Sequence, residues 1–275
     1  MNKLQRIYIP TLGRVGNQIT YNNMPDWVKD ITYFVIQPHE EEIFREMYPN
    51  SNIKVLPLTI KGIARTREWI INDGGDACYA VFDDDIKFTK RNVDRKTLKK
   101  NSDKSNEAFT EEHWKEMFIR IGEWFDEGVG LGGCFAKGSP PKEEDEKQFG
   151  KFIQVHFING SKIFREELDW SLKWGEDIHF VLQILKRGVK TRLSDIYLVD
   201  SEEYYSDGGC MEEGRTVDKD IECLKELELI YPHIFSIVWN KHYTLNKIFK
   251  LPKIKVEWRK AYNPYYGRVA NHQWF

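Results

Sequence analysis

The sequence predicts an α/β fold with a mostly parallel central sheet, and three observations support that prediction. Four short β-rich segments follow one another in the first third of the chain, at residues 6–10, 31–37, 53–58 and 78–82. Helical or loop segments separate them, which is the pattern of a mostly parallel sheet. A chain of 275 residues is also long enough to bury a substantial core. We therefore expect a sheet of the Rossmann-like class, flanked by helices.

Helix signals lie between these segments. Pro38 stands where a first helical residue belongs, and the acidic run at 40–42 fills the first turn of a helix that continues to about Tyr48. Residues 63–72 form a second predicted helix, which the Asp-Gly-Gly sequence at 73–75 ends. Both helices would connect consecutive strands.

The second half of the chain is less regular. Thr110 can cap a long helix whose large apolar residues repeat at helical spacing and should form its buried stripe. Residues 130–136 and 152–158 are predicted strands, and the polar loop at 137–150 between them is either a mobile lid or a disordered insertion. A further helix is predicted at 215–231.

Past His233 the pattern weakens. We expect a catalytic domain over residues 1–232 and a small C-terminal extension over residues 233–275 that packs on it. Lysines and arginines alternate with aromatic residues in this extension, so it is either a surface that binds nucleic acid or an arm that packs its aromatic rings into the core.

Composition and charge narrow the class of protein. Hydrophobic residues make up 41% and charged residues 31%, as in a soluble globular protein. No secretory signal is visible, and no run approaches the ~18 apolar residues of a membrane span. The four cysteines show neither CxxC pairing nor zinc spacing. We therefore expect a cytoplasmic protein with reduced thiols and no membrane partner.

The net charge of −2 is unevenly distributed. Residues Lys87–Lys104 carry a net charge of +6 and residues Lys241–Phe275 a net charge of +7, which leaves −15 on the rest of the chain. Two basic segments in an otherwise acidic protein indicate a polyanionic partner; two solvated loops are the alternative.

Three consecutive aspartates follow the fourth predicted strand. Because side chains alternate along a strand, Asp83 and Asp85 should share one side while Asp84 faces the other. Neighbouring carboxylates repel unless a cation lies between them, and a hard divalent cation would leave coordination positions for phosphate oxygens. The sequence thus predicts that Asp83 and Asp85 bind Mn²⁺ or Mg²⁺ in an enzyme that handles a nucleoside diphosphate.

The end of the first predicted strand should lie at the same edge of the sheet, where open α/β sheets bind ligands. Thr11 offers a hydroxyl there, and Arg14 offers a fork that can grip phosphate or a base edge. A simple turn is the alternative interpretation of this segment.

A second acidic motif, Glu176-Asp177, opens a predicted helix that closes at Lys186-Arg187-Gly188. Acidic residues at a helix start suit the helix dipole, so ordinary capping explains them as well. A carboxylate in that place beside a metal–phosphate site could also take a proton from an acceptor hydroxyl. Asp177 is the expected base, with Glu176 as the second choice.

Together these motifs resemble the GT-A glycosyltransferases. The resemblance rests on Pro10-Thr11 with Arg14, on Arg67 sixteen residues before Asp83, on a DxD motif at 83–85 and on an xED motif at 175–177. It implies a GT-A fold, a metal-dependent transfer from a nucleotide-sugar such as a UDP-sugar, and inversion with Asp177 as base. It also implies that Arg14, Arg65, Arg67 and Asp84 contact the donor, and that a late residue, Asp207 or Asp200, is a third metal ligand.

Within that superfamily the chain is similar to the glycosyltransferases associated with TET/JBP-type dioxygenases, many of them encoded by bacteriophages. The similarity rests on the segment at residues 9–14, on the helix start at residues 62–67 and on the late Asp-Gly-Gly turn followed by Arg215. It implies transfer to a hydroxymethylated pyrimidine of DNA, such as hydroxymethylcytosine, in the host cytoplasm, with Lys87–Lys104 and Lys241–Phe275 contacting the DNA.

Other functions remain open at this point. A transferase of the same fold could act on a protein or a glycan, and a non-catalytic nucleic-acid-binding protein could use the aspartates as a strand cap. A nucleotidyltransferase would also place paired carboxylates around a metal, but it does not need the late Glu176-Asp177 pair.

Overall fold

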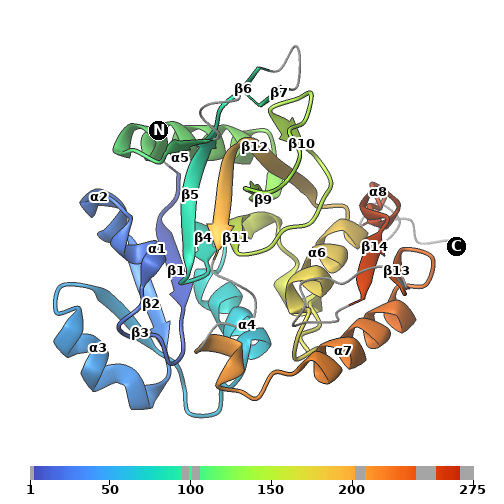
Figure 1. The fold of residues 1–275 in the computed structure, drawn as a ribbon. Coiled ribbons are helices and arrows are strands. Elements are labelled where there is room, and N and C mark those ends of the chain that lie inside the picture. The colour runs from blue at the N-terminus through green and yellow to red at the C-terminus, as the bar shows by residue number, and fades with distance from the viewer. Residues whose placement is uncertain (1–2, 95–98, 101–105, 202–207, 240–251, 267–275) are drawn as a thin grey trace, which may run out of the picture.

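The computed structural model describes residues 3–94, 99–100, 106–201, 208–239 and 252–266. Its main feature is a large mixed sheet (Figure 1). In sheet order its strands are β3 (Asn52–Val55), β2 (Thr32–Ile36), β1 (Arg6–Pro10), β4 (Cys78–Phe82), β11 (Val155–Asn159), β9 (Val129–Ala136), β12 (Lys190–Ser201), β5 (Ile86–Arg91) and β8 (Asn106–Ala108), with β10 (Glu146–Lys147) paired to β12. Two small sheets pair β6 (Val93–Asp94) with β7 (Lys99–Lys100) and β13 (Phe235–Val238) with β14 (Lys253–Val256).

Helices fill the connections. The α-helices are α1 (Ile19–Asn22), α2 (Asp26–Lys29), α3 (Glu41–Met47), α4 (Ile63–Gly74), α5 (Glu111–Asp126), α6 (Glu176–Lys186), α7 (Val217–Ile230) and α8 (Trp258–Ala261). The short 3₁₀ segments are η1 (Pro38–Glu40), η2 (Gly160–Lys162), η3 (Arg165–Glu167) and η4 (Gly209–Met211). Within the described part of the chain, none of the helices is both long and apolar enough to cross a membrane.

The predicted α/β class with a parallel core is confirmed. Strands β3, β2, β1 and β4 run parallel, and β9 and β12 form a further parallel pair. Ile7, Tyr8 and Ile9 of β1 are fully buried, because helices cover both faces of a parallel sheet. Strands β11 and β5 add antiparallel pairings beyond β4, which the sequence pattern did not indicate.

Each face of the sheet has its own hydrophobic core. One core joins the strands to α5 through Trp124 and Phe118, and the other joins them to α4 and α6 through Ile70 and Leu182. The capping prediction for α5 is confirmed, since Thr110 and its N3 residue exchange side-chain and backbone hydrogen bonds. The predicted apolar stripe is also buried and consists of Trp114, Met117, Phe118, Ile121, Trp124 and Phe125.

The 137–150 loop is not a disordered insertion, because it is bonded to the sheet. It includes β10, which pairs with β12, and its Lys142 N–H donates to Asp195 Oδ2 at 2.8 Å. Asp195 in turn pairs with the buried Arg91 at 2.9 Å, and Arg91 also donates to the Ser139 carbonyl at 3.1 Å. A buried ion pair thus anchors the loop to the sheet.

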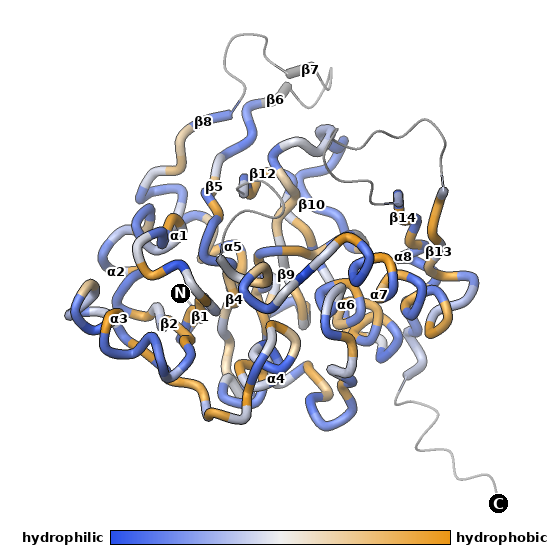
Figure 2. Tube along the Cα trace, turned by 60° about the horizontal axis from the view of Figure 1, so that its bottom comes forward, coloured by the Kyte–Doolittle hydropathy of each residue, from blue (hydrophilic) through white to orange (hydrophobic). Residues whose placement is uncertain are grey.

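The described part of the C-terminal extension packs on the rest of the chain. Strand β13 lies against α7, and α8 lies against α6 (Figure 2). Along β14 the lysines Lys253 and Lys255 are exposed, whereas Ile254 and Val256 pack against the core. This alternation is that of a half-buried strand.

Candidate functional site

A cavity of about 660 Å³ opens beyond the carboxyl ends of β1 and β4. Its walls come from the segment after β1, the turn after β4, the first turns of α4 and α6, and residues 208–215. Ligands of open α/β sheets bind at this edge, and the volume falls in the range of small-molecule sites.

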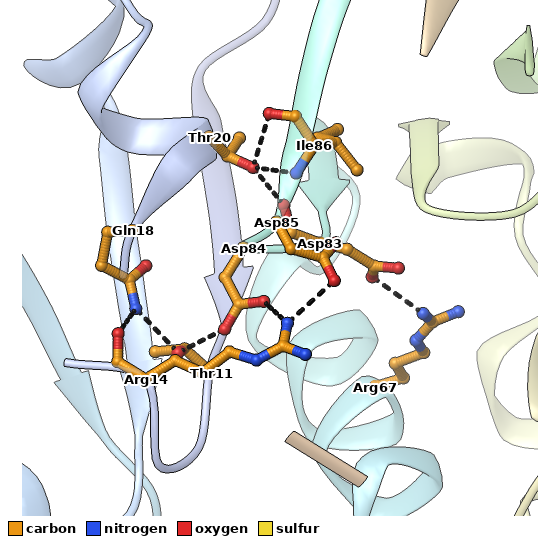
Figure 3. Close-up of polar contacts among 9 residues, drawn as sticks. All are labelled: Thr11, Arg14, Gln18, Thr20, Arg67, Asp83, Asp84, Asp85 and Ile86. Carbon is orange, nitrogen blue, oxygen red and sulfur yellow. Dashed lines mark hydrogen bonds and ion pairs between the residues drawn. The ribbon is translucent and has the colours of Figure 1, made fainter. Parts of the chain in front are cut away.

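The three aspartates lie in the turn between β4 and β5, not in the strand (Figure 3). Arg14 Nη1 lies 2.8 Å from both Asp84 Oδ1 and Asp85 Oδ2, whereas Asp83 Oδ1 accepts from Arg67 Nη2 at 3.1 Å. The expectation that Asp83 and Asp85 share a side while Asp84 faces away is therefore wrong. Strand alternation ends with β4, and the turn directs Asp84 and Asp85 to one guanidinium.

Asp84 is the buried member of the turn. Its Oδ2 accepts from the Thr11 hydroxyl at 2.5 Å, and Gln18 Nε2 donates to the same hydroxyl oxygen at 2.9 Å. Burial raises the pKa of Asp84 to about 6, although attraction to Arg14 and the hydrogen bond from Thr11 oppose the shift. Thr11 and Arg14 thus fix the aspartate turn against the end of β1.

Arg67 connects the aspartate turn to the second acidic motif. Besides Asp83, its guanidinium faces Glu176, with Nε 3.5 Å from Oε1. Burial is the main cause that raises the pKa of Glu176 to about 7; attraction to Arg67 opposes the shift and repulsion from Asp177 adds to it. The pKa of Asp83 is also raised, again mainly by burial. Among the described residues Nη1 of Arg67 is buried and has no hydrogen-bond partner.

The start of α6 presents the predicted base. Gly175, with φ 75°, occupies a left-handed conformation that turns the chain into the helix. Glu176 is buried, while Asp177 is half-buried and lines the cavity with its Oδ1 accepting from the Ile178 N–H at 2.8 Å. The two acids therefore differ in exposure, and Asp177 is the more accessible to an acceptor.

The late glycine pair closes the cavity over Arg14. The Gly209 N–H donates to the Leu12 carbonyl at 2.7 Å. Gly208 has φ 84°, and a Cβ at this position would lie 2.5 Å from Arg14 Cγ, so a side chain is excluded there. The expected metal ligand Asp207 lies outside the described residues.

No metal centre is evident from geometry alone. Within the described ranges, no group of three or more His, Cys, Asp or Glu residues is placed to hold a metal ion. Asp200, the other candidate for a third ligand, lies on β12 and pairs with Lys137 at 2.6 Å. The carboxylates of the aspartate turn face arginines instead.

The structure places some of the other predicted donor-binding residues in the cavity and one outside it. Thr11, Arg14 and Arg67 line the cavity, but Arg65 does not; it is exposed and pairs with Glu68 at 2.6 Å. The difference arises because residues 65 and 67 lie on different faces of α4.

Several cavity residues were not predicted. Gln37 and Leu56 follow β2 and β3, and the rule that ligands bind beyond strand ends could have found them. Gln154 precedes β11 and also lines the cavity, but nothing in its sequence context marks it.

The first basic segment is partly used inside the molecule. Arg91 is buried on Asp195, and Lys90 pairs with Glu116 at 2.9 Å. Arg91 is therefore held inside the molecule, whereas Lys90 is half-buried and Lys87 is exposed. The side chains of residues 93–105 lie outside the description.

In the C-terminal extension, too, some residues pack inside the molecule and others are exposed. Trp258 and Tyr262 pack against the core and are partly buried, and the ring centroid of Tyr262 lies 5.3 Å from that of Phe149. Tyr265 is exposed. Residues 240–251 and 267–275 are not among those described.

Comparison with known proteins identifies the family. Residues 5–209 match the family model of the TET-Associated Glycosyltransferase. Two solved structures are similar at low level: "The Crystal Structure of UDP-glucose pyrophosphorylase complexed with UDP-glucose" (8% identity, 83% of this chain, 100% of that chain, TM-score 0.42) and "UTP-bound UGPase from acinetobacter baumannii" (9% identity, 84% and 95%, TM-score 0.38). No curated protein matches the sequence. Since the family model covers most of the chain, the protein belongs to the TET-associated glycosyltransferase family.

Proposed function

We propose that this glycosyltransferase moves a sugar from a nucleotide-sugar, specifically a UDP-sugar, to a hydroxymethylated pyrimidine of DNA such as hydroxymethylcytosine. The supporting observation is Arg67, whose guanidinium contacts Asp83 on one side and Glu176 on the other. This arginine joins the turn that suits a diphosphate to the helix start that suits an acceptor. The family supports DNA as the acceptor, because its members are associated with dioxygenases that act on bases.

The cavity wall suggests how the donor lies. Apolar Val35 near the end of β2 and Leu56 just after β3 line one part of the cavity, where a nucleobase would fit. Arg14 and Arg67 line the part next to the aspartate turn and would face the diphosphate.

The donor set suits a hard divalent cation. Asp83 and Asp85 line the cavity, their side chains are 28% and 17% exposed, and carboxylate oxygens are the ligands that Mg²⁺ and Mn²⁺ prefer. These two residues would hold the ion, with Asp207 as the proposed third ligand. A bound cation would neutralise charge on the departing diphosphate.

Asp177 is the proposed base. It would accept the proton of the acceptor hydroxyl while the hydroxyl oxygen bonds to the anomeric carbon and the bond from that carbon to the diphosphate oxygen breaks. A single displacement of this kind inverts the anomeric configuration. Glu176, which Arg67 orients, is the alternative base.

Release of nucleoside diphosphate tests the proposal. The purified protein is incubated with Mn²⁺, a panel of nucleotide-sugars and three duplexes that carry hydroxymethylcytosine, hydroxymethyluracil or cytosine. We expect rapid diphosphate release only with a hydroxymethylated duplex, and much slower release with Asp177→Asn. Equal release with all three duplexes, or turnover only with a protein or glycan acceptor, would contradict the proposed acceptor.

A further inference from the structure

The residue before β11 has an unusual backbone. Gln154 has φ 64°, and among the described residues only His233 shares a positive φ without being glycine. The Val155 N–H donates to the Ile153 carbonyl at 2.6 Å, so residues 153–155 form a γ-turn of the strained kind with positive central φ. Strained residues of this type concentrate at functional sites.

Three contacts hold the turn in this conformation. The Asp83 N–H donates to the Gln154 carbonyl at 2.8 Å, and Val155 pairs with Phe82 in the sheet. The buried His156 hydrogen-bonds the backbone just before the turn, at Phe152. The surrounding structure thus imposes a positive φ that every residue other than glycine resists.

Gln154 lies beside the aspartate turn. Through its carbonyl it contacts Asp83 of the aspartate turn, and the strand that follows packs against α6 through His156 and Phe180, whose ring centroids are 5.8 Å apart. Gln154 lines the cavity, and among the described residues its side-chain amide forms no hydrogen bond.

The chemistry of the amide indicates its ligand. A neutral amide offers two donors and one acceptor, which suits sugar hydroxyl groups, whereas arginines line the part of the cavity proposed for the diphosphate. In a direct displacement the transferred sugar must lie between the diphosphate and the base. We propose that the Gln154 amide binds hydroxyl groups of the transferred sugar and thereby selects the sugar of the donor. This inference rests on the proposed function.

Separate measurement of UDP and UDP-sugar affinity tests the inference. Calorimetry compares wild type, Gln154→Ala and Gln154→Gly with UDP and with UDP-glucose, UDP-galactose and UDP-N-acetylglucosamine. We expect UDP to bind all three proteins equally, and the sugar that supports transfer to bind both variants about 3- to 10-fold more weakly. The difference in affinity among the three UDP-sugars should be smaller in both variants than in the wild type.

The backbone is controlled separately. Glycine accommodates a positive φ, so Gln154→Gly should melt no lower than Gln154→Ala. His233→Gly makes the same backbone change at an exposed position outside the cavity and should leave both affinities unchanged.

The outcomes are distinct. Unchanged UDP-sugar affinity in both Gln154 variants, with transfer intact, would overturn the inference alone. Equal loss of UDP and UDP-sugar affinity would also overturn it, because the turn would then only shape the site. A wild-type protein that transfers no sugar from any donor would overturn the proposed function, and the inference with it.

Discussion

At Arg67 a single side chain serves two carboxylates where little water reaches. The side chain of Arg67 is 10% exposed and that of its partner Glu176 is 9% exposed. Removal of one partner from such a buried ion pair leaves an uncompensated charge, which costs about 3–5 kcal/mol. The proposed catalytic site and the stability of the fold would therefore depend on the same guanidinium.

The neighbouring arginine on α4 gives a matched comparison. We expect Arg67→Ala to lower the melting temperature by roughly 10 °C and to abolish detectable transfer. Arg65→Ala removes only an exposed pair with Glu68 and should change stability by less than about 0.5 kcal/mol, with normal activity. Thermal melts and transfer assays of both variants check this, and a strong loss of donor binding in Arg65→Ala would contradict its placement outside the cavity.

Glu176 should make stability depend on pH. Its carboxyl pKa rises from 4.5 to about 7 on folding, so the folded state holds the proton more tightly than the unfolded chain does. The resulting stability is complete below about pH 4.5 and is lost as the pH rises through about 7.

Glu176→Gln keeps the shape of the protonated acid and removes the titration. We expect the melting temperature of the variant to rise relative to wild type between about pH 5 and pH 8, and the difference then to level off. Melts across this range measure it. A difference that stays constant with pH would show that Glu176 does not hold its proton on folding.

At the scale of elements, the loop at 137–150 illustrates long-range anchoring. Asp195 of β12 and Arg91 of β5 form an ion pair and are almost fully buried. The loop is bonded to this pair, because the Lys142 N–H donates to Asp195 and Arg91 donates to the Ser139 carbonyl. We expect Asp195→Ala to cost about 3–5 kcal/mol and to speed proteolysis within the loop, without a change in UDP affinity. Lys90→Ala, which removes a more exposed pair, is the control. If Asp195→Ala weakened UDP binding as strongly as it lowered stability, the loop would not be independent of the site.

The same elements show what sequence can and cannot predict. Local signals suffice for β1, β4, α5 and α6, because hydrophobic period, caps and glycines lie within a few residues of one another. The aspartate turn was misjudged because a strand pattern does not state where the strand ends. The sequence places Arg91 in a basic segment that faces a polyanion or solvent, since its partner Asp195 is more than a hundred residues away. Gln154 gave no signal at all, because its conformation is imposed by neighbouring strands.

At the scale of the whole molecule, described basic residues gather on the C-terminal extension. Lys253, Arg259 and Lys260 are exposed, whereas Trp258, which lies between them, packs partly against the core. If this surface contacts DNA phosphates, the logarithm of the DNA-binding constant should fall with the logarithm of the salt concentration. The slope should be about −0.9 per phosphate contact. In that case the extension would contact DNA mainly through its charged side chains, and less through base stacking.

Charge reversal tests that surface. We expect a Lys253→Glu, Arg259→Glu, Lys260→Glu variant to bind duplex DNA more weakly and with a shallower salt dependence, while its affinity for UDP stays at the wild-type value. Fluorescence anisotropy over a range of salt concentrations provides the slope. An unchanged slope would exclude this face as the DNA contact.

The cavity lined by Asp83, Arg67 and Asp177 is proposed to transfer a sugar to DNA. The most direct test of this claim is mass spectrometry of the nucleosides digested from a hydroxymethylated duplex after incubation with nucleotide-sugar and Mn²⁺. We expect a glycosylated nucleoside with the wild-type protein and none with Asp83→Ala. A duplex left unmodified by the wild-type protein, or modified equally by Asp83→Ala, would contradict the claim.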